Sequence, residues 1–472
     1  MFTTYTYQDW LAAPDGDRLK LLEDIVRTYK ASVDFKEAQT AQEYFRADKT
    51  AVASKVMLRT KKIRTKGQNG RIKTEAGTDE VIGNRIRSSF FSRFVTQQNQ
   101  FLLGNGVTLK TEELKKKLGL GFDKAEEQAG ECALLHGVCW GYWNLDHIEI
   151  LPAYVDGLSG FVALLDERTS EPGVGVQFWQ MDVDRPMYVR LFEPDGLTEY
   201  RQSKGGFMEI AAKRAYKQTW VKDGAGAQLV GAENYGRLPI VPFYASEIKR
   251  SELTPAIKSK IDLYDNILSD FGDNLDRAND VYWVLNNFGG TSEDIVDMLT
   301  EIQRIKAVAN LSDGTGSSST AEPHTIEVPY AARQTALQLL EKALYQDYMA
   351  LNMDELTGGS LTNVAIEASM TNLNLKADRF EWQAFRFVQD VLALSGIKTE
   401  EITFKRQSIA NKSEIVQDIY TMRADIDLRT ALKLNPYIMQ DEIDGIVDAL
   451  AAEQLTGQPS MEDLQRIVDG DV

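Results

Sequence analysis

The feature that most constrains this chain is the stretch over residues 251–395, where helical periodicity dominates. Apolar residues recur every three or four positions from Leu253 onward, which predicts one long amphipathic helix over about residues 254–280. Thr254 and Pro255 supply an N-cap and a first helical residue. Roughly thirty residues at 1.5 Å each make a helix of about 45 Å, which is long for a globular core.

Two further long helices follow the first. One is predicted over residues 331–351, and another over residues 362–394 with a bend at residues 371–374, where Thr and Asn disfavour a helix. Between the first two helices, a small β module is expected. It has strand-like residues 282–285, 305–311 and 325–328, a short acidic helix at 293–301 and a low-complexity loop at 312–320.

The first 136 residues are predicted to be mainly helical. Helical patterns cover residues 8–52, 81–103, 110–117 and 124–135, and glycines follow the second and the last of these. Beyond Gly137 the period changes to two, and short aromatic and β-branched segments predict an antiparallel β domain up to residue 221. An extended, proline-containing segment at residues 236–243 then leads into the first long helix.

The C-terminal part returns to helices after one strand. Residues 402–405 are predicted to be a lone strand that pairs with the β domain. Helices follow from Asn411 to about residue 422, after Asp427, and over residues 440–453. The fold class expected from these patterns is α+β.

Composition limits the function classes. A formal net charge of -17 argues against a surface that wraps nucleic acid as a whole, because phosphates attract positive faces. Two cysteines cannot build a disulfide framework, so synthesis in a reducing cytosol is expected. The N-terminus lacks the pattern of a signal peptide, and no apolar run is long enough to span a membrane.

A basic run stands out in this acidic chain. It consists of Lys55, Arg59, Lys61, Lys62, Arg64, Lys66, Arg71 and Lys73. Such a run is typical of a nucleic-acid patch, and it also fits an exposed arm that meets an acidic neighbour or subunit.

Few patterns indicate chemistry. Cys132, His136 and Cys139 have the spacing of metal ligands on one helix face, with His147 or Asp146 as a fourth ligand, but Gly137 breaks that helix. The alternative is two buried thiols beside a helix-terminal histidine. No phosphate-binding loop and no nucleophile elbow are present in the sequence.

Acidic residues along the first long helix also allow two interpretations. They form either a solvated face or a stripe that lines a water-filled centre when several copies pack through their apolar seams. The members of this acidic stripe singled out for the second interpretation are Asp262, Asp265, Asp270, Asp273 and Asp276.

The order of these parts resembles the portal (head-tail connector) proteins of tailed bacteriophages, in the branch of long-tailed phages that infect Gram-positive bacteria. The residues that carry the resemblance lie in four segments. Each segment alone is only loosely similar to the family, but all four occur in the same order as in the family over most of the chain. They are residues 81–108, residues 236–265 with the sequence GRLPIVPF, residues 358–366 with the sequence GGSLTNVAI, and residues 411–453.

The resemblance implies a portal fold assembled as a ring. Its parts would be a mixed α/β wing (1–250), two stem helices (251–280 and 330–351) and a small α/β clip between them (281–329). A tunnel loop (352–363), a long bent helix (364–395), a strand returning to the wing (396–410) and a helical crown with the C-terminal tail (411–472) would follow.

The resemblance also implies which residues act. The tunnel loop at the channel constriction would be Leu356, Thr357, Gly358, Gly359, Ser360, Leu361, Thr362 and Asn363. Many family members have Ser-Gly at the position of Thr362 and Asn363, so a stiffer end to this loop is expected. The residues of the clip that dock the packaging motor would be Glu293, Asp294, Asp297 and Glu301. No catalytic residue, metal or cofactor is implied.

The function implied is a ring of twelve copies, or thirteen, at one vertex of the capsid in the virion, assembled in the host cytoplasm. Double-stranded DNA would pass through it, driven by the terminase large subunit. Other partners would be the major capsid and scaffolding proteins and a head-completion or adaptor protein. No membrane partner is expected. Two alternatives stay open at this point: a nucleic-acid-processing enzyme that grips its substrate with the basic run, and a scaffold or tail structural protein.

Overall fold

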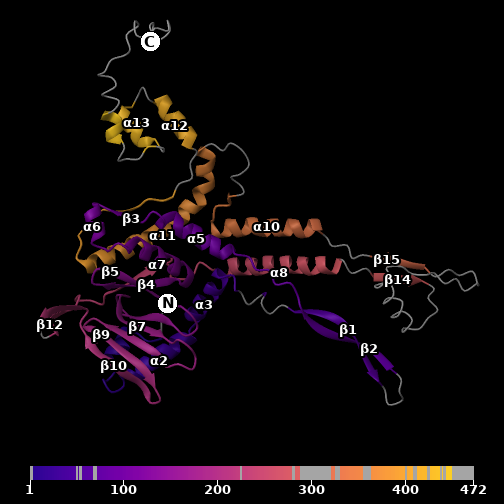
Figure 1. The fold of residues 1–472 in the computed structure, drawn as a ribbon, viewed down its shortest axis with the longest axis horizontal. Coiled ribbons are helices and arrows are strands. Elements are labelled where there is room, and N and C mark those ends of the chain that lie inside the picture. The colour runs from indigo at the N-terminus through magenta and orange to yellow at the C-terminus, as the bar shows by residue number, and fades with distance from the viewer. Residues whose placement is uncertain are drawn as a thin grey trace, which may run out of the picture.

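The computed structural model describes residues 4–48, 52, 56–66, 72–223, 226–278, 282–286, 320–324, 330–353, 363–398, 401–407, 412–422, 426–435, 438 and 443–448. Within these ranges, helices combine with strands that pair antiparallel, as the α+β prediction expected (Figure 1). None of the helices in this part of the chain is long and apolar enough to cross a membrane.

The β domain is built on a five-stranded sheet with the order β10-β9-β8-β7-β6. Helices α1 and α2 share its core, where Trp10 and Tyr29 pack with Phe178 and Phe192. Their bounds, and those of a neighbouring hairpin, are α1 Tyr7–Ala12, α2 Arg18–Ala31, β6 Gly160–Leu165, β7 Pro172–Trp179, β8 Tyr188–Glu193, β9 Gly196–Ser203, β10 Gly206–Arg214, β11 Lys217–Asp223 and β12 Gly226–Glu233.

A three-stranded sheet with the order β13-β4-β5 separates two cores. Along β4, Trp140 packs in the core of the β domain, and its neighbour Cys139 packs in a helical core, because side chains alternate across a strand. The strand bounds are β4 Val138–Asn144, β5 His147–Pro152 and β13 Ile240–Tyr244. The predicted extended segment before the first long helix is therefore an ordered strand of this sheet.

The helical core joins elements that are far apart in sequence. Phe94, Phe243, Tyr348 and Phe387 belong to it. The contributing helices are α3 Val33–Phe45, α5 Phe90–Leu103, α7 Phe122–His136, α8 Pro255–Ala278, α10 Tyr330–Tyr348 and α11 Asn363–Ser395. All three long helices predicted from periodicity are therefore present.

Gly137 joins the helical core to the β sheet. It ends α7 with φ +85°, a left-handed conformation that favours glycine. A Cβ there would lie 2.8 Å from the Cα of Arg250 and from the carbonyl oxygen of Lys249. The carbonyl of Gly137 accepts the N–H of Ala245 at 3.1 Å, so the segment leading into α8 is held against this turn.

Two predictions of local structure are corrected. Residues 81–89 are not helical, because β2 Ile72–Ile82 pairs with β1 Val56–Lys66 and an extended segment follows before α5. The strand β16 Ile402–Phe404 pairs with β3 Val107–Leu109 and not with the β domain. The strand predicted at residues 282–285 is confirmed, since β14 covers Tyr282–Asn286.

The remaining elements are short. They are α6 Glu112–Lys116, β14 Tyr282–Asn286, β15 Thr320–His324, α12 Lys412–Thr421 and α13 Leu428–Leu434. Asp427 caps α13 as predicted, since its Oδ2 accepts the N–H of Thr430 at 3.1 Å. The strands predicted over residues 305–311 and 325–328 lie outside the described residues, whereas β14 pairs with β15.

Candidate functional site

The two long helices α8 and α10 pack side by side and extend together away from the β domain (Figure 1). Aromatic contacts join α8 to α10 and α8 to α5. The Phe271 and Tyr330 rings meet edge to face at 5.6 Å, and Tyr264 meets Phe90 of α5 at 5.0 Å. Large apolar side chains nevertheless stay exposed on the pair, namely Leu263, Leu275, Tyr330 and Leu339.

The acidic stripe of α8 faces partly inward. Asp265 and Asp273 are buried, as is Ser269 between them. Each accepts one backbone N–H group. Asp265 accepts that of Ser88 at 3.0 Å, Ser269 that of Ile86 at 3.0 Å, and Asp273 that of Asn84 at 2.6 Å. We call these three α8 side chains the backbone clamp.

The clamp works because two periodicities coincide. Four residues of helix rise about 6 Å, and two residues of extended chain span about 6.6 Å. Side chains spaced by four on α8 can therefore reach every second N–H of the segment 83–89, which runs antiparallel to the helix. Gly83 fits the same arrangement, since a Cβ there would lie 2.8 Å from Asp273 Oδ2.

The clamp corrects the prediction of an acidic surface. Asp265 and Asp273 are buried and are engaged within their own chain, where their carboxylates accept backbone N–H groups of the segment 83–89. Asp262 is half-buried and accepts a hydrogen bond from the Tyr44 hydroxyl. Asp270 is exposed on the helix, and the side chain of Asp276 lies outside the described residues.

The other predicted site residues mostly lie outside the described part of the chain. Of the tunnel-loop residues, only Asn363 is described, as the first residue of α11. The four clip residues, from Glu293 to Glu301, are all outside it. Their roles stay predictions.

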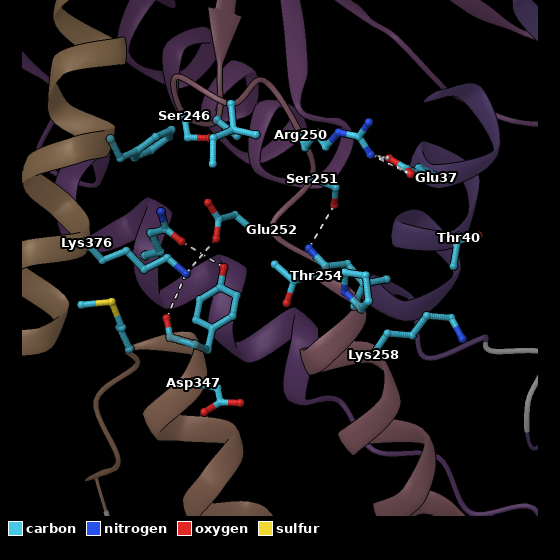
Figure 2. Close-up of a pocket in the computed structure, with 18 of the residues that line it drawn as sticks. Glu37, Thr40, Ser246, Arg250, Ser251, Glu252, Thr254, Lys258, Asp347 and Lys376 are labelled. Atoms are coloured by element: carbon cyan, nitrogen blue, oxygen red, sulfur yellow. Dashed lines mark hydrogen bonds and ion pairs between the residues drawn. The ribbon is translucent and has the colours of Figure 1, made fainter. Parts of the chain in front are cut away.

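Sequence reasoning missed a cavity of about 670 Å³ at the base of the long helices. It lies between α3, the segment 245–258, the end of α10 and α11 (Figure 2). Opposite charges meet around it: Arg250 pairs with Glu37 at 3.2 Å and Lys376 with Glu252 at 2.9 Å. These residues are distant in sequence, so no local pattern marked them.

Lys376 is the most enclosed charge of this cavity. Its Nζ donates to the Tyr348 carbonyl at 2.9 Å and lies 3.2 Å from the centre of the Tyr348 ring. Burial lowers the pKa of Lys376, and the Glu252 carboxylate opposes that shift. The Tyr348 hydroxyl donates to Gln98 on α5 at 2.9 Å. These polar contacts join α11, the segment before α8, α10 and α5.

The proposed soft-ligand set does not assemble around a metal. Cys139 is buried on β4, and His136 ends α7, where its Nε2 lies 3.2 Å from the amide oxygen of Gln42. Within the ranges given above, no group of three or more His, Cys, Asp or Glu side chains is placed to hold a metal ion. Burial lowers the pKa of His136 to about 3, so the ring is neutral. The structure favours the alternative in part, since Cys139 is buried, Cys132 is partly exposed and His136 ends its helix.

One buried carboxyl has no role in these contacts. Glu126 on α7 is fully buried, and among the residues that the structure describes neither of its carboxyl oxygens has a hydrogen-bond partner. Burial raises the pKa of Glu126 well above its ordinary value, and the nearby Asp123 adds to the shift. The group is thus a source of pH-dependent stability.

Comparison with known proteins gives one consistent family. The family model described as phage portal protein, SPP1 Gp6-like, matches residues 28–456. The portal protein of Clostridium phage phiCD119 is 28% identical over 360 residues, which cover 71% of this chain and 73% of the relative. The portal protein of Bacillus phage SPP1 is 30% identical over 401 residues, covering 77% and 75%.

Proposed function

The chain belongs to the SPP1 Gp6-like family of phage portal proteins, and from that membership we propose that its copies form a ring at one capsid vertex. The family is a structural, non-enzymatic one that serves DNA packaging. We propose twelve copies, with thirteen as the alternative, around a channel through which double-stranded DNA enters and later leaves. The terminase large subunit would supply the energy for packaging.

The α8 and α10 pair is proposed as the stem of the subunit. Exposed Leu263, Leu275 and Leu339 support this assignment, because apolar side chains on an extended helix pair are buried when copies pack side by side. With Asp265 and Asp273 held in the backbone clamp, the exposed Asp270 and the half-buried Asp262 are the described members of the acidic stripe proposed for the channel wall.

The partner assignments rest on the order of segments. We propose that the segment between the stem helices docks the terminase through Glu293, Asp294, Asp297 and Glu301. The residues from Leu356 to Asn363 would narrow the channel. Head-completion, major capsid and scaffolding proteins would bind elsewhere on the ring.

The observation that carries the proposal is the family match over most of the chain, together with a helix pair that extends from the body. Two-dimensional class averages of the purified full-length protein, by electron microscopy, test it. Rings with a central channel are expected. Compact monomers at high protein concentration, or filaments of a scaffold or tail protein, would overturn the proposal.

A further inference from the structure

Two thiols lie on facing elements where the helical core meets the three-stranded sheet. Helix α7 ends just before Gly137, β4 begins just after it, and the two elements pack against each other (Figure 1). Cys132 lies on α7, five positions before Gly137, and Cys139 lies on β4, two positions after it. Five helical residues rise about 7.5 Å and two strand residues span about 6.6 Å. The two cysteines are therefore equally far from the turn, on opposite arms of it.

The side chains of both cysteines point into the space between these arms. Cys139 is buried in the helical core, and Cys132 packs against the same core while staying partly exposed. The two thiols share a side-chain hydrogen bond, and the Cys139 Sγ also donates to the Trp140 carbonyl at 3.9 Å. One thiol of the pair is therefore accessible from outside, and the other lies within its reach.

The histidine between the two cysteines does not join them. The His136 ring meets the Tyr154 ring edge to face at 6.0 Å, and Tyr154 belongs to the core of the β domain. The Nε2 atom of His136 lies beside Gln42. Structural zinc sites use four ligands, so two thiols without this imidazole favour sulfur chemistry over metal binding.

We propose that Cys132 and Cys139 form a modification site, at which exchange with a low-molecular-weight disulfide closes a disulfide bond within the chain. The site depends on the fold of one chain and not on the ring. Only its timing rests on the proposed function, because a portal is assembled in a reducing cytosol, where thiols persist, and a released virion enters an oxidising medium. The bond would then form after assembly.

The exchange takes two steps. The accessible Cys132 thiol loses its proton to solvent and attacks one sulfur of the small disulfide, whose S–S bond breaks and releases one thiolate that takes up a proton. Cys139 then loses its proton and attacks the Cys132 Sγ, which releases the second small thiol. The two cysteines are oxidised and the small disulfide is reduced to two thiols.

The second step is expected to be the slower one. Burial raises the pKa of the Cys139 thiol, and the hydrogen bond with Cys132 adds to the shift. Since the thiolate is the nucleophile, a thiol that loses its proton less readily reacts more slowly. A mixed disulfide on Cys132 is therefore the expected intermediate.

Mass spectrometry of the full-length protein treated with cystamine, a small disulfide, tests the proposal. After unfolding, alkylation and trypsin digestion, both cysteines stay on one peptide, because no Lys or Arg lies between them. The expected product is this peptide without alkylation and lacking two hydrogen atoms. Cys139→Ser should stop at a cysteamine adduct on Cys132. Cys132→Ser should react at least about tenfold more slowly, because the remaining thiol is buried.

The urea-unfolded chain, treated with the same excess of cystamine, is the matched control. Without the fold to hold the thiols together, cysteamine adducts on both cysteines should prevail. Equal yields of the bridged peptide from folded and unfolded chains would overturn the proposal, as would a folded natural chain that keeps two free thiols or a lasting adduct on Cys132. Electron microscopy of the same samples keeps the two proposals apart, since rings of an unbridged chain would leave the proposed function intact.

Hydrogen exchange measures what the bond does to the fold. The Ala245 N–H donates to the Gly137 carbonyl at 3.1 Å, inside the turn that the bond would close. A cross-link removes open conformations, so exchange at Ala245 should become about fivefold slower in the bridged chain. The amide of Val189, in β8 of the five-stranded sheet, is the control and should be unchanged. Equal exchange at Ala245 in the reduced and bridged chains would contradict a bond at this turn.

Discussion

The Lys376 ammonium lies 2.9 Å from Glu252 Oε2 and 3.2 Å from the centre of the Tyr348 ring. One lysine of α11 thereby contacts both the segment that begins α8 and the end of α10. Since the pair is largely enclosed, its partners depend on each other: removing one leaves an uncompensated charge in a region that water reaches poorly.

Removing the acidic partner should weaken the fold. We expect Glu252→Gln to lower the free energy of unfolding by about 2 kcal/mol, because the Lys376 charge then keeps only the carbonyl and ring of Tyr348. Urea unfolding of the full-length chain measures this. Glu247→Gln, on an exposed neighbour, is the matched control and should change stability by less than about 0.5 kcal/mol. Equal effects of the two changes would contradict this account of the cavity.

The backbone clamp makes a local prediction. Ser269→Ala removes the acceptor of the Ile86 N–H and should cost about 1 kcal/mol, since a part-buried donor loses its partner on the buried Ser269. Hydrogen exchange at the Ile86 amide should become faster. Ser259→Ala is the control, because that exposed hydroxyl bonds only to Ala256 of its own helix among the contacts described. If exchange at Ile86 stays unchanged in Ser269→Ala, the clamp does not hold the segment.

The buried Glu126 should make stability fall at higher pH. Its pKa is higher in the folded chain than in the unfolded chain. Below the unfolded pKa the carboxyl is neutral in both states and stability is fully present, and this stability is lost as pH rises through the folded pKa. Glu126→Gln, which stays neutral, should therefore be more stable than the natural chain at pH 8 by at least about 1 kcal/mol. Urea unfolding between pH 5 and pH 9 measures the difference, and Glu113→Gln, at an exposed position, should leave the pH profile unchanged.

His136 should act in the opposite direction. Its pKa of about 3 in the folded chain lies below the unfolded value of about 6.5. Below pH 6.5 the imidazole of His136 is protonated in the unfolded chain but stays neutral in the folded chain. The free energy of unfolding therefore falls as pH decreases from 6.5. His136→Gln should remove up to about 3 kcal/mol of the loss between pH 7 and pH 4. A profile unaltered by His136→Gln would contradict the prediction.

Much of the fold was predictable where the signal is local. Thr254 caps α8 as expected, with its Oγ1 accepting the N–H of Ile257 at 3.3 Å, and Gly137 ends α7 in the left-handed conformation that its position indicated. The periodicity of the long helices and of the β domain was also sufficient. These features depend on neighbours a few residues away, and the sequence displays them directly.

The errors came from contacts between distant segments. Residues 83–89 carry a helical pattern, yet Asp265, Ser269 and Asp273 of α8 hold them extended. The acidic stripe of α8 was expected to face outward, whereas its members Asp265 and Asp273 are buried against this segment. Pairing of β16 with β3 likewise joins residues almost 300 positions apart, which no periodicity reveals.

Gly137 has a mechanical consequence for the subunit. The end of α7, the start of β4 and the backbone of Lys249 and Arg250 come within touching distance at a residue that has no side chain. The segment 245–254, which connects β13 to α8, is therefore supported at Gly137, and a side chain at that position would push this segment away and displace the start of α8.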